Sequence, residues 1–159
     1  FPYTTLFRSH HFLGIDPHGH ASIVATTGNP DGHLVLRGGR QGPNYDAAAV
    51  SAAAIELAKA GVATRMMVDC SHDNSQKDWR RQSAVCAAVA EQVAKGGVHL
   101  MGVMIESNLV AGRQDLPKDR SRLVHGQSIT DACVDFPATE SMLTALAASV
   151  ATGRSAAAA

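Results

Sequence analysis

The sequence has little of what would assign it to a specialised class of protein. Its 159 residues include three cysteines, an odd number without a CxxC pair, which argues against a disulfide framework and a structural zinc site. Only 4% of the residues are aromatic, and 14 basic residues balance 14 acidic ones, so no global charge attracts nucleic acid or an anionic membrane. No apolar run approaches the roughly 20 residues of a membrane-spanning helix. These absences leave an ordinary cytoplasmic domain with an aliphatic core.

The two ends of the chain are unlike the rest. The first nine residues, FPYTTLFRS, match the in-frame translation of the end of a widely used sequencing-adapter oligonucleotide. We therefore interpret residues 1–9 as an artefact, with a genuine disordered start as the alternative, and we expect the natural chain to begin upstream of His10. Residues 153–159 form a low-complexity tail, of which we expect residues 155–159 to fray. The folded part is then residues 10–152 of a fragment.

Strand-like apolar runs alternate with helix-like segments along this part of the chain. The predicted strands are residues 21–26, 33–36, 66–70 and 98–105. Turn residues at 28–32 predict that the first two strands form a hairpin or lie close together. The predicted helices end at residue 60, span residues 77–95 and span residues 139–150, with Asn44 or Asp46 as the first cap and Thr139 or a neighbour as the last.

Three cycles of strand, loop and helix, each of roughly 35 residues, indicate parallel strands joined by helical crossovers. A complete (β/α)8 barrel takes about 250 residues. The cycles therefore suit either part of such a barrel or a small open sheet, and spacing alone favours neither. In both cases the polar residues that follow the strands lie where α/β enzymes keep their active sites.

Each predicted parallel strand ends in a different chemical group. Arg37, His72 and Glu106 follow successive strands, and Asp131 lies in the loop beyond the last of them. Neutral imidazole with carboxylate oxygens suits manganese, iron(II), cobalt or zinc, and such an ion can polarise a substrate carbonyl. Arg37, followed by two glycines, is suited to bidentate binding of phosphate or carboxylate. The pattern predicts a metal-dependent enzyme for anionic, carbonyl-bearing substrates.

Each of these residues also has a structural interpretation. His72 is equally consistent with a hydrogen-bonded residue at a strand end, and Glu106 with a helix cap. Arg37 has Asp69 as a possible ion-pair partner, and Asp131 suits a turn. The residues taken one at a time do not decide between these alternatives and the metal site.

The cysteines and the remaining histidines carry no assigned chemistry. Cys70 follows the alternating pattern of a buried strand, so we predict that it packs as a small hydrophobic residue and is not a nucleophile. Cys86 falls on a predicted helix and is expected in the core. The other seven histidines have no HExxH-like spacing.

Four motifs make the sequence recognisable. In order and at nearly unaltered separations, they are LRGGRQGPNY (36–45), MVDCSHDNSQK (67–77), GVMIESNLVAG (102–112) and SITDAC (128–133). Together they resemble the C-terminal part of the type I 3-deoxy-D-arabino-heptulosonate 7-phosphate (DAHP) synthases, typified by the enteric bacterial isoenzymes. The resemblance extends from residue 10 to about residue 150.

This resemblance implies both a fold and an activity. The family is a (β/α)8 TIM barrel with a β-hairpin decoration, and Leu34, Val68 and Val103 would mark its last three strands. The implied transferase joins phosphoenolpyruvate to erythrose 4-phosphate in the first step of the shikimate pathway, which leads to chorismate and the aromatic amino acids. Homo-oligomers are expected at full length. The fragment alone is expected to be inactive. Alternatives are another metal-dependent aldolase or lyase on a TIM barrel, or a non-catalytic fragment.

The resemblance also implies roles for single residues. His72, Glu106 and Asp131 match three of four metal ligands, while the fourth, a cysteine from an early strand, is absent. Arg37 matches a residue that binds phosphoenolpyruvate, and Asp131 is also expected to contact substrate. His72 is expected to assist proton transfer.

A regulatory role is implied for the segment that begins at residue 11. Phe12 and Gly14 match the decoration that contributes to the effector pocket and to subunit contacts in the family. Gly14 and the NPDGH segment at 29–33 resemble the tyrosine-inhibited branch more than the phenylalanine-inhibited one. The alternative is that Gly14 merely belongs to a turn.

Overall fold

The computed structural model describes residues 9–157, with side chains described as far as residue 155. Residues 1–8 lie outside the described part, so the artefact interpretation stays a prediction. The segment predicted as one folded part is divided between His33 and Leu34 into two compact units. No described helix has the length and apolar character needed to cross a membrane.

The first unit contains an antiparallel hairpin. Strand β1 (His11–Ile15) pairs with β2 (Ala21–Ala25), from His11 opposite Ala25 to Ile15 opposite Ala21. In the turn, the Asp16 carboxylate accepts hydrogen bonds from the backbone N–H groups of His18 and His20, at 2.8 and 2.9 Å. The turn that joins β1 to β2 is therefore stabilised by hydrogen bonds between residues that are close in the sequence.

The predicted pairing of residues 21–26 with residues 33–36 is wrong. Both strands exist, but β2 pairs with β1, while residues 34–36 form β3 (Leu34–Leu36) in the second unit. The reason lies in their side chains. β2 alternates between exposed and half-buried positions, whereas β3 is apolar and at least partly buried at every position, as in a parallel sheet.

The second unit is built on the predicted parallel strands. β3, β4 (Met66–Asp69) and β5 (Leu100–Met104) form a parallel sheet in the order β3-β4-β5. Helix α2 (Ala47–Lys59) connects β3 to β4, and α3 (Gln82–Ala94) connects β4 to β5. The prediction of an α/β fold with helical crossovers is confirmed.

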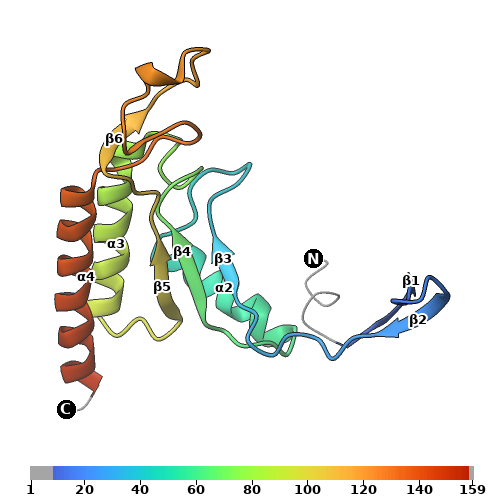
Figure 1. Cartoon of the computed structure of the whole chain (residues 1–159). Helices are drawn as coiled ribbons and strands as arrows, with labels where there is room; N and C mark the ends of the chain where they lie inside the picture. The colour runs from blue at the N-terminus through green and yellow to red at the C-terminus, as the bar shows by residue number, and fades with distance from the viewer. Residues whose placement is uncertain (1–8, 158–159) are drawn as a thin grey trace. The chain divides into compact units, whose positions relative to one another are not determined.

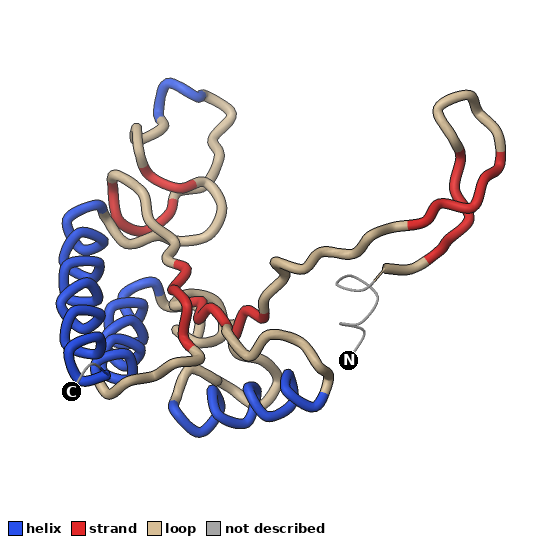
Figure 2. The backbone as a smooth tube through the Cα atoms, turned by 90° about the horizontal axis from the view of Figure 1, so that it is seen from below, coloured by secondary structure: helices blue, strands red, loops and turns tan. Residues whose placement is uncertain are grey.

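A single core joins the sheet to the helices. Figures 1 and 2 show α3 beside α4 (Phe136–Ala157), the last helix of the described chain. The buried core side chains come from β3, β4, α2, α3 and α4 and include Leu36, Val50, Ala54, Met66, Val68, Val85, Val89 and Met142. Their burial fixes the strands from which the polar loops extend.

The helix ends agree with the predictions in one case and differ in two. Asp46 caps α2, because its side chain accepts a hydrogen bond from the Ala49 N–H at 2.9 Å. The helix predicted from residue 77 begins as α3 only at Gln82, after a 3₁₀ turn, η1 (Trp79–Arg81). Gln76 and Lys77 have φ angles of 55° and 60°, which cannot start a right-handed helix.

The last helix is longer than predicted at both ends. It begins at Phe136, not at residue 139, because the Asp135 side chain accepts a hydrogen bond from the Ala138 N–H at 2.9 Å. It continues to Ala157, so residues 155–157, which were expected to fray, are helical. Gly153 is buried against α3, where an added Cβ would collide with the carbonyl oxygen of Val93.

Two short strands carry the chain beyond β5. β6 (Val110–Arg113) and β7 (Gln127–Ser128) pair in parallel, with a 3₁₀ turn, η2 (Arg120–Arg122), in the loop between them. Single bridges link Ser107 to Val134 and Gly112 to Cys133. These contacts bring the loop after β7 back to the residues that follow β5.

Candidate metal centre

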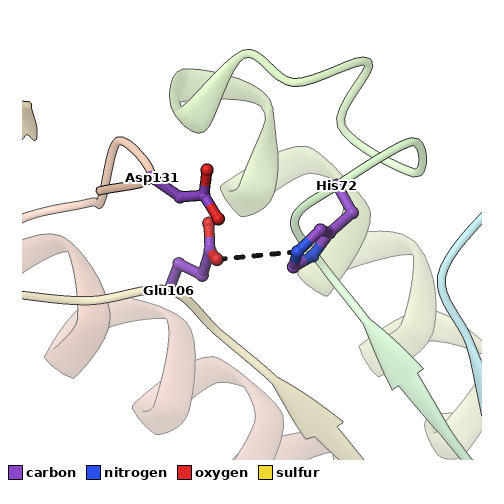
Figure 3. Close-up of side chains that lie close together, drawn as sticks. All are labelled: His72, Glu106 and Asp131. Atoms are coloured by element: carbon purple, nitrogen blue, oxygen red, sulfur yellow. Dashed lines mark ion pairs between the residues drawn. The ribbon is translucent and has the colours of Figure 1, made fainter.

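Three potential metal ligands meet at the carboxyl ends of the parallel strands. His72 follows β4, Glu106 follows β5, and Asp131 lies in the loop after β7. One ligand atom from each lies within 4.8 Å of those of the other two. Figure 3 shows the three side chains converging, with His72 Nε2 at 3.7 Å from Glu106 Oε1. The sequence placed His72 and Glu106 at strand ends and Asp131 in a loop beyond them, and the fold brings the three together.

The imidazole of His72 is positioned from both sides. Its Nδ1 lies 2.8 Å from Oδ2 of Asp69, a fully buried carboxylate. The two groups are not aligned for a hydrogen bond. Its Nε2 lies 2.7 Å from Nη2 of Arg37. Since a guanidinium can only donate, Nε2 accepts, and the network assigns the proton of the neutral ring to Nδ1. A carboxylate behind one ring nitrogen is the arrangement typical of metal-binding histidines.

Arg37 links this arrangement to β3. Its Nε donates to Asp69 Oδ2 at 3.2 Å, so the ion pair considered from sequence is present. The Arg37 side chain is 53% exposed. A metal ion at His72 Nε2 and the contact from Arg37 exclude each other, because one lone pair cannot serve both. Metal binding therefore requires that the guanidinium leave Nε2.

Glu106 is held through its backbone as well as its side chain. The fully buried Gln82 donates from Nε2 to the Glu106 carbonyl at 3.1 Å and accepts from the Glu106 N–H at 2.9 Å. Ser71 Oγ donates to Oε2 of the Glu106 carboxylate at 2.7 Å. The alternative that Glu106 caps a helix is wrong, since it follows β5 while Asp46, Arg81 and Asp135 stand at the starts of α2, α3 and α4.

A buried asparagine joins the loops around the site. Asn74 donates from Nδ2 to the carbonyls of Leu36 and Asp69, at 3.0 and 2.8 Å, and its Oδ1 accepts from the Asn44 N–H at 2.8 Å. Gly38, with φ of 78°, lies against this loop, where an added Cβ would be 2.6 Å from the Asp73 Cβ. The ends of β3 and β4 are thereby fixed relative to each other.

The ligand side chains line a cavity of about 260 Å³, open to solvent. Its lining residues are Ser71, His72, Lys77, Glu106, Asp131 and Ala132. Within the described part of the chain, the exposed carboxylate of Asp131 makes no hydrogen bond or ion pair, and the local turn is made by Ser128, whose Oγ accepts from the Thr130 N–H at 3.2 Å. A turn role for the Asp131 side chain is thus not supported, and the donor set of one imidazole and two carboxylates fits a borderline divalent ion.

The cysteines near the site are packing residues. Cys70 and Cys86 are buried in the core, and contact with Cys86, together with burial, raises the pKa of the Cys70 thiol. Burial also raises the pKa of Cys133, against the opposing effect of a hydrogen bond with Ser128. Raised pKa values keep thiols protonated and poorly nucleophilic. The prediction that Cys70 packs and is not a nucleophile agrees with its burial.

The residues assigned to an effector pocket lie in β1. Gly14 pairs with Ser22, so the alternative that it belongs to the turn is wrong. Phe12 is 48% exposed and pairs with Val24. Their role in effector binding stays a prediction.

Sequence reasoning missed three residues of the site: Asn74, Lys77 and Gln82. Gln82 had a usable signal, because it lies three, four and seven residues before Val85, Cys86 and Val89 and therefore on the buried side of α3. A polar residue on an apolar helix side is expected to have a buried partner. Asn74 and Lys77 had no such signal, since both lie in a loop.

These features define an α/β protein with a candidate metal centre at the carboxyl ends of parallel strands. The chain belongs to the DAHP synthetase I family, whose sequence model matches residues 5–144. That match includes five of the nine residues interpreted as an artefact, residues 5 to 9.

Individual relatives agree with the family match. The chain is 49% identical over 146 residues to a phospho-2-dehydro-3-deoxyheptonate aldolase of Alternaria alternata, covering 91% of this chain and 39% of that protein. It is 45% identical over 136 residues to the Tyr-sensitive enzyme of Escherichia coli strain K12, covering 86% and 38%. The solved structure of the Francisella tularensis SCHU S4 aldolase matches with a TM-score of 0.85 and 46% identity, over 94% of this chain and 43% of that one.

Two facts bear on which properties of these relatives can be assigned to this chain. The chain spans about two fifths of the length of the curated relatives it matches. A phenylalanine-inhibited relative from Saccharomyces cerevisiae is 44% identical, against 45% for the Tyr-sensitive enzyme of Escherichia coli. Overall identity therefore does not separate the two inhibition types.

Proposed function

We propose that this chain carries the metal centre and part of the phosphoenolpyruvate site of a 3-deoxy-7-phosphoheptulonate synthase. The reaction joins phosphoenolpyruvate, erythrose 4-phosphate and water to give DAHP and phosphate. The observation that carries the proposal is the meeting of three ligand atoms within 4.8 Å: those of His72 and Glu106, at the ends of the adjacent parallel strands β4 and β5, and that of Asp131, in the loop after β7. Membership of the DAHP synthetase I family supports it.

The proposed architecture is a (β/α)8 TIM barrel in which β3, β4 and β5 are the last three strands. Their parallel order and the helical connections support this. The fourth metal ligand, a cysteine, and most substrate-binding cations would come from parts of the enzyme that this chain does not cover. We further propose a cytoplasmic homo-oligomer, with β1 and β2 as the decoration that contributes Phe12 and Gly14 to effector binding.

His72, Glu106 and Asp131 would hold a divalent ion, either manganese, iron(II), cobalt or zinc. When bound, such an ion would supply Lewis-acid polarisation of the aldehyde of erythrose 4-phosphate. Because Arg37 Nη2 donates to Nε2, the proton of the neutral His72 ring lies on Nδ1, 2.8 Å from Asp69 Oδ2, and the Nε2 lone pair would be available to the metal once the guanidinium leaves. A coordinated Nε2 cannot also accept a proton, and the ligand role of His72 therefore comes before its suggested role in proton transfer.

Arg37 would bind the phosphate or carboxylate of phosphoenolpyruvate. Its guanidinium is half exposed at the end of β3 and already adjoins His72 Nε2. When the guanidinium leaves that nitrogen, its Nη2 donor becomes available to an anion beside the metal. Asp131, which is exposed at the rim, would orient the second substrate.

The test is a chimera in which the N-terminal portion of the Escherichia coli Tyr-sensitive enzyme precedes residue 10 of this chain. We expect manganese-dependent formation of DAHP from the two substrates, and no product from the purified chain alone. His72→Ala and Glu106→Gln should each lower kcat by at least about 100-fold. His99→Ala, in the loop before β5, is the matched control and should leave kcat unchanged.

Two results would contradict the proposal. A correctly folded chimera that binds manganese without forming product would favour a different aldolase or lyase, or a non-catalytic role. Full activity in the His72→Ala chimera would remove this residue from the metal centre.

A further inference from the structure

Lys77 lines the same cavity as the three candidate ligands. In the described part of the chain, no ion pair or hydrogen bond is recorded for its ammonium group, although Glu106 and Asp131 line the cavity too. By contrast, Lys59 and Lys95 pair with neighbouring glutamates at 2.7 and 2.6 Å. Lys77 is therefore a cation of the cavity that the carboxylates do not engage.

The backbone that carries Lys77 is strained and tied to His72. Gln76 and Lys77 are consecutive non-glycine residues with φ of 55° and 60°, a conformation that costs free energy at each position. The Lys77 N–H donates to the His72 carbonyl at 2.8 Å, which closes the loop. Strain of this kind persists where surrounding contacts enforce it and is common at ligand sites. The loop thus holds His72 and the exposed Lys77 at one cavity.

The charges in the cavity indicate what Lys77 meets there. Two carboxylates and one ammonium give the cavity a formal charge of about −1 while the imidazole is neutral. A divalent cation on the carboxylates would reverse this sign and leave the ammonium as a positive group beside the metal. An anionic oxygen that enters the cavity is then attracted by Lys77, which lines it, and by Arg37, which adjoins His72.

We propose that Lys77 is an anion-binding residue of this site and contacts a phosphate or carboxylate group of the molecule that enters the metal cavity. The proposal rests on the proposed function for the identity of the site, but the contact itself requires only the cavity and its charges. The competing interpretation is that Lys77 serves as a counter-ion for Glu106 and Asp131 when no metal is bound. In that case Lys77 would control metal affinity and not anion affinity.

Anion binding can be followed by the fluorescence of Trp79. It is the only tryptophan of the chain, lies two residues after Lys77, and is partly buried beneath the Arg80 guanidinium at 4.6 Å. Its fluorescence should change when an anion binds nearby. Using the full chain with and without manganese, we would titrate inorganic phosphate in one arm and pyruvate in the other, which separates phosphate from carboxylate recognition.

Lys77→Met should weaken binding of the preferred anion by at least about 10-fold, because one charge-assisted hydrogen bond is lost. Lys77→Arg should recover part of that affinity. Manganese affinity, measured by electron paramagnetic resonance of the free ion, should change by less than about 3-fold in Lys77→Met. Lys95→Met, which removes an exposed lysine from the end of α3, is the control and should leave both affinities unchanged.

The outcomes separate this inference from the proposed function. Equal anion affinity in wild type and Lys77→Met, or no binding of either anion by wild type, overturns the role of Lys77. A large loss of manganese affinity in Lys77→Met, with anion binding intact, supports the counter-ion interpretation instead. Failure of wild type to bind manganese counts against the metal centre, while a loss of phosphate or pyruvate binding in Lys77→Met would still support the anion site.

Discussion

The β1–β2 hairpin and the carboxyl edge of the β3-β4-β5 sheet are stabilised in different ways. In the hairpin, the apolar side chains of Leu13, Ile15 and Ile23 are 82%, 76% and 73% exposed, and the contacts are those of its own ladder. At the sheet edge, Asn74 and Gln82 are buried and hydrogen-bonded to residues 24 to 38 positions away.

This difference indicates that the geometry of the candidate site depends on buried polar side chains and their hydrogen bonds. A ladder between neighbouring strands needs correct register but tolerates many side chains. A buried polar group tolerates little, because the loss of its partner leaves an unsatisfied donor or acceptor away from water. Equivalent substitutions in the two regions should therefore have very unequal effects.

The largest difference is expected between two glycines with similar backbone angles. Gly38→Ala places a Cβ 2.6 Å from the Asp73 Cβ and 2.8 Å from the Asp73 carbonyl carbon, at φ of 78°. Gly19→Ala has φ of 87° but nothing within 4 Å. We expect losses in the free energy of unfolding of about 3 kcal/mol or more and about 1 kcal/mol, respectively. Urea denaturation followed by circular dichroism measures both losses. Equal losses would contradict the expected difference between the sheet edge and the hairpin.

The next effect concerns the amide pair of Gln82. Gln82→Ala leaves the backbone N–H of Glu106 without its partner and should cost about 2–3 kcal/mol of unfolding free energy. Thr26→Ala removes a hydroxyl that accepts from the His10 N–H at 3.1 Å beside the hairpin, and should cost under about 1 kcal/mol. The same denaturation experiment applies. A cost for Gln82→Ala below that of Thr26→Ala would show that the amide pair does not fix Glu106.

Two serines provide a third pair. Ser71→Ala removes the hydroxyl that donates to Glu106 Oε2 at 2.7 Å, and we expect manganese affinity to fall about 10-fold. Ser22→Ala removes a 3.4 Å hydrogen bond to the His20 carbonyl in the hairpin and should not change that affinity. Isothermal titration calorimetry of both variants is the measurement. Unchanged affinity in Ser71→Ala would mean that Glu106 needs no orienting contact.

The smallest effect is a dependence on pH in the sheet unit alone. The pKa of Cys70 is raised above its ordinary value of 9.0 by contact with Cys86 and by burial, so unfolded thiols ionise first as the pH increases. The contribution of Cys70 to stability is therefore complete well below pH 9 and is lost above it, by about 1 kcal/mol at pH 10. Cys70→Ala should reduce this slope. A slope unchanged by Cys70→Ala would argue against the burial of this thiol in solution.

Much of the fold followed from the sequence because its signals are local. The apolar runs near Leu34, Val68 and Val103 became parallel strands, and Asp46 capped its helix as predicted. The meeting of His72 with Glu106 followed from their positions at the ends of such strands, since parallel strands bring their carboxyl ends to one edge, whereas Asp131 reaches them from the loop after β7.

The errors came from contacts that the sequence does not encode locally. Nothing near residues 21–26 specifies that their partner is His11–Ile15 and not Leu34–Leu36. Left-handed backbone at Gln76 and Lys77 is uncommon for such residues, so α3 was predicted to begin too early. The partnership of Gln82 with Glu106 spans 24 residues and depends on how α3 packs beside β5.

If the proposed metal and anion sites are correct, the contact between Arg37 Nη2 and His72 Nε2 would make metal and anion binding cooperative. An anion that attracts the guanidinium frees the ring nitrogen for the metal, and a metal that occupies the nitrogen frees the guanidinium for the anion. Linkage requires that each ligand increase the affinity of the other by the same factor. In a cell where the metal is scarce, the concentration of the anionic substrate would then determine how much of the protein is metallated.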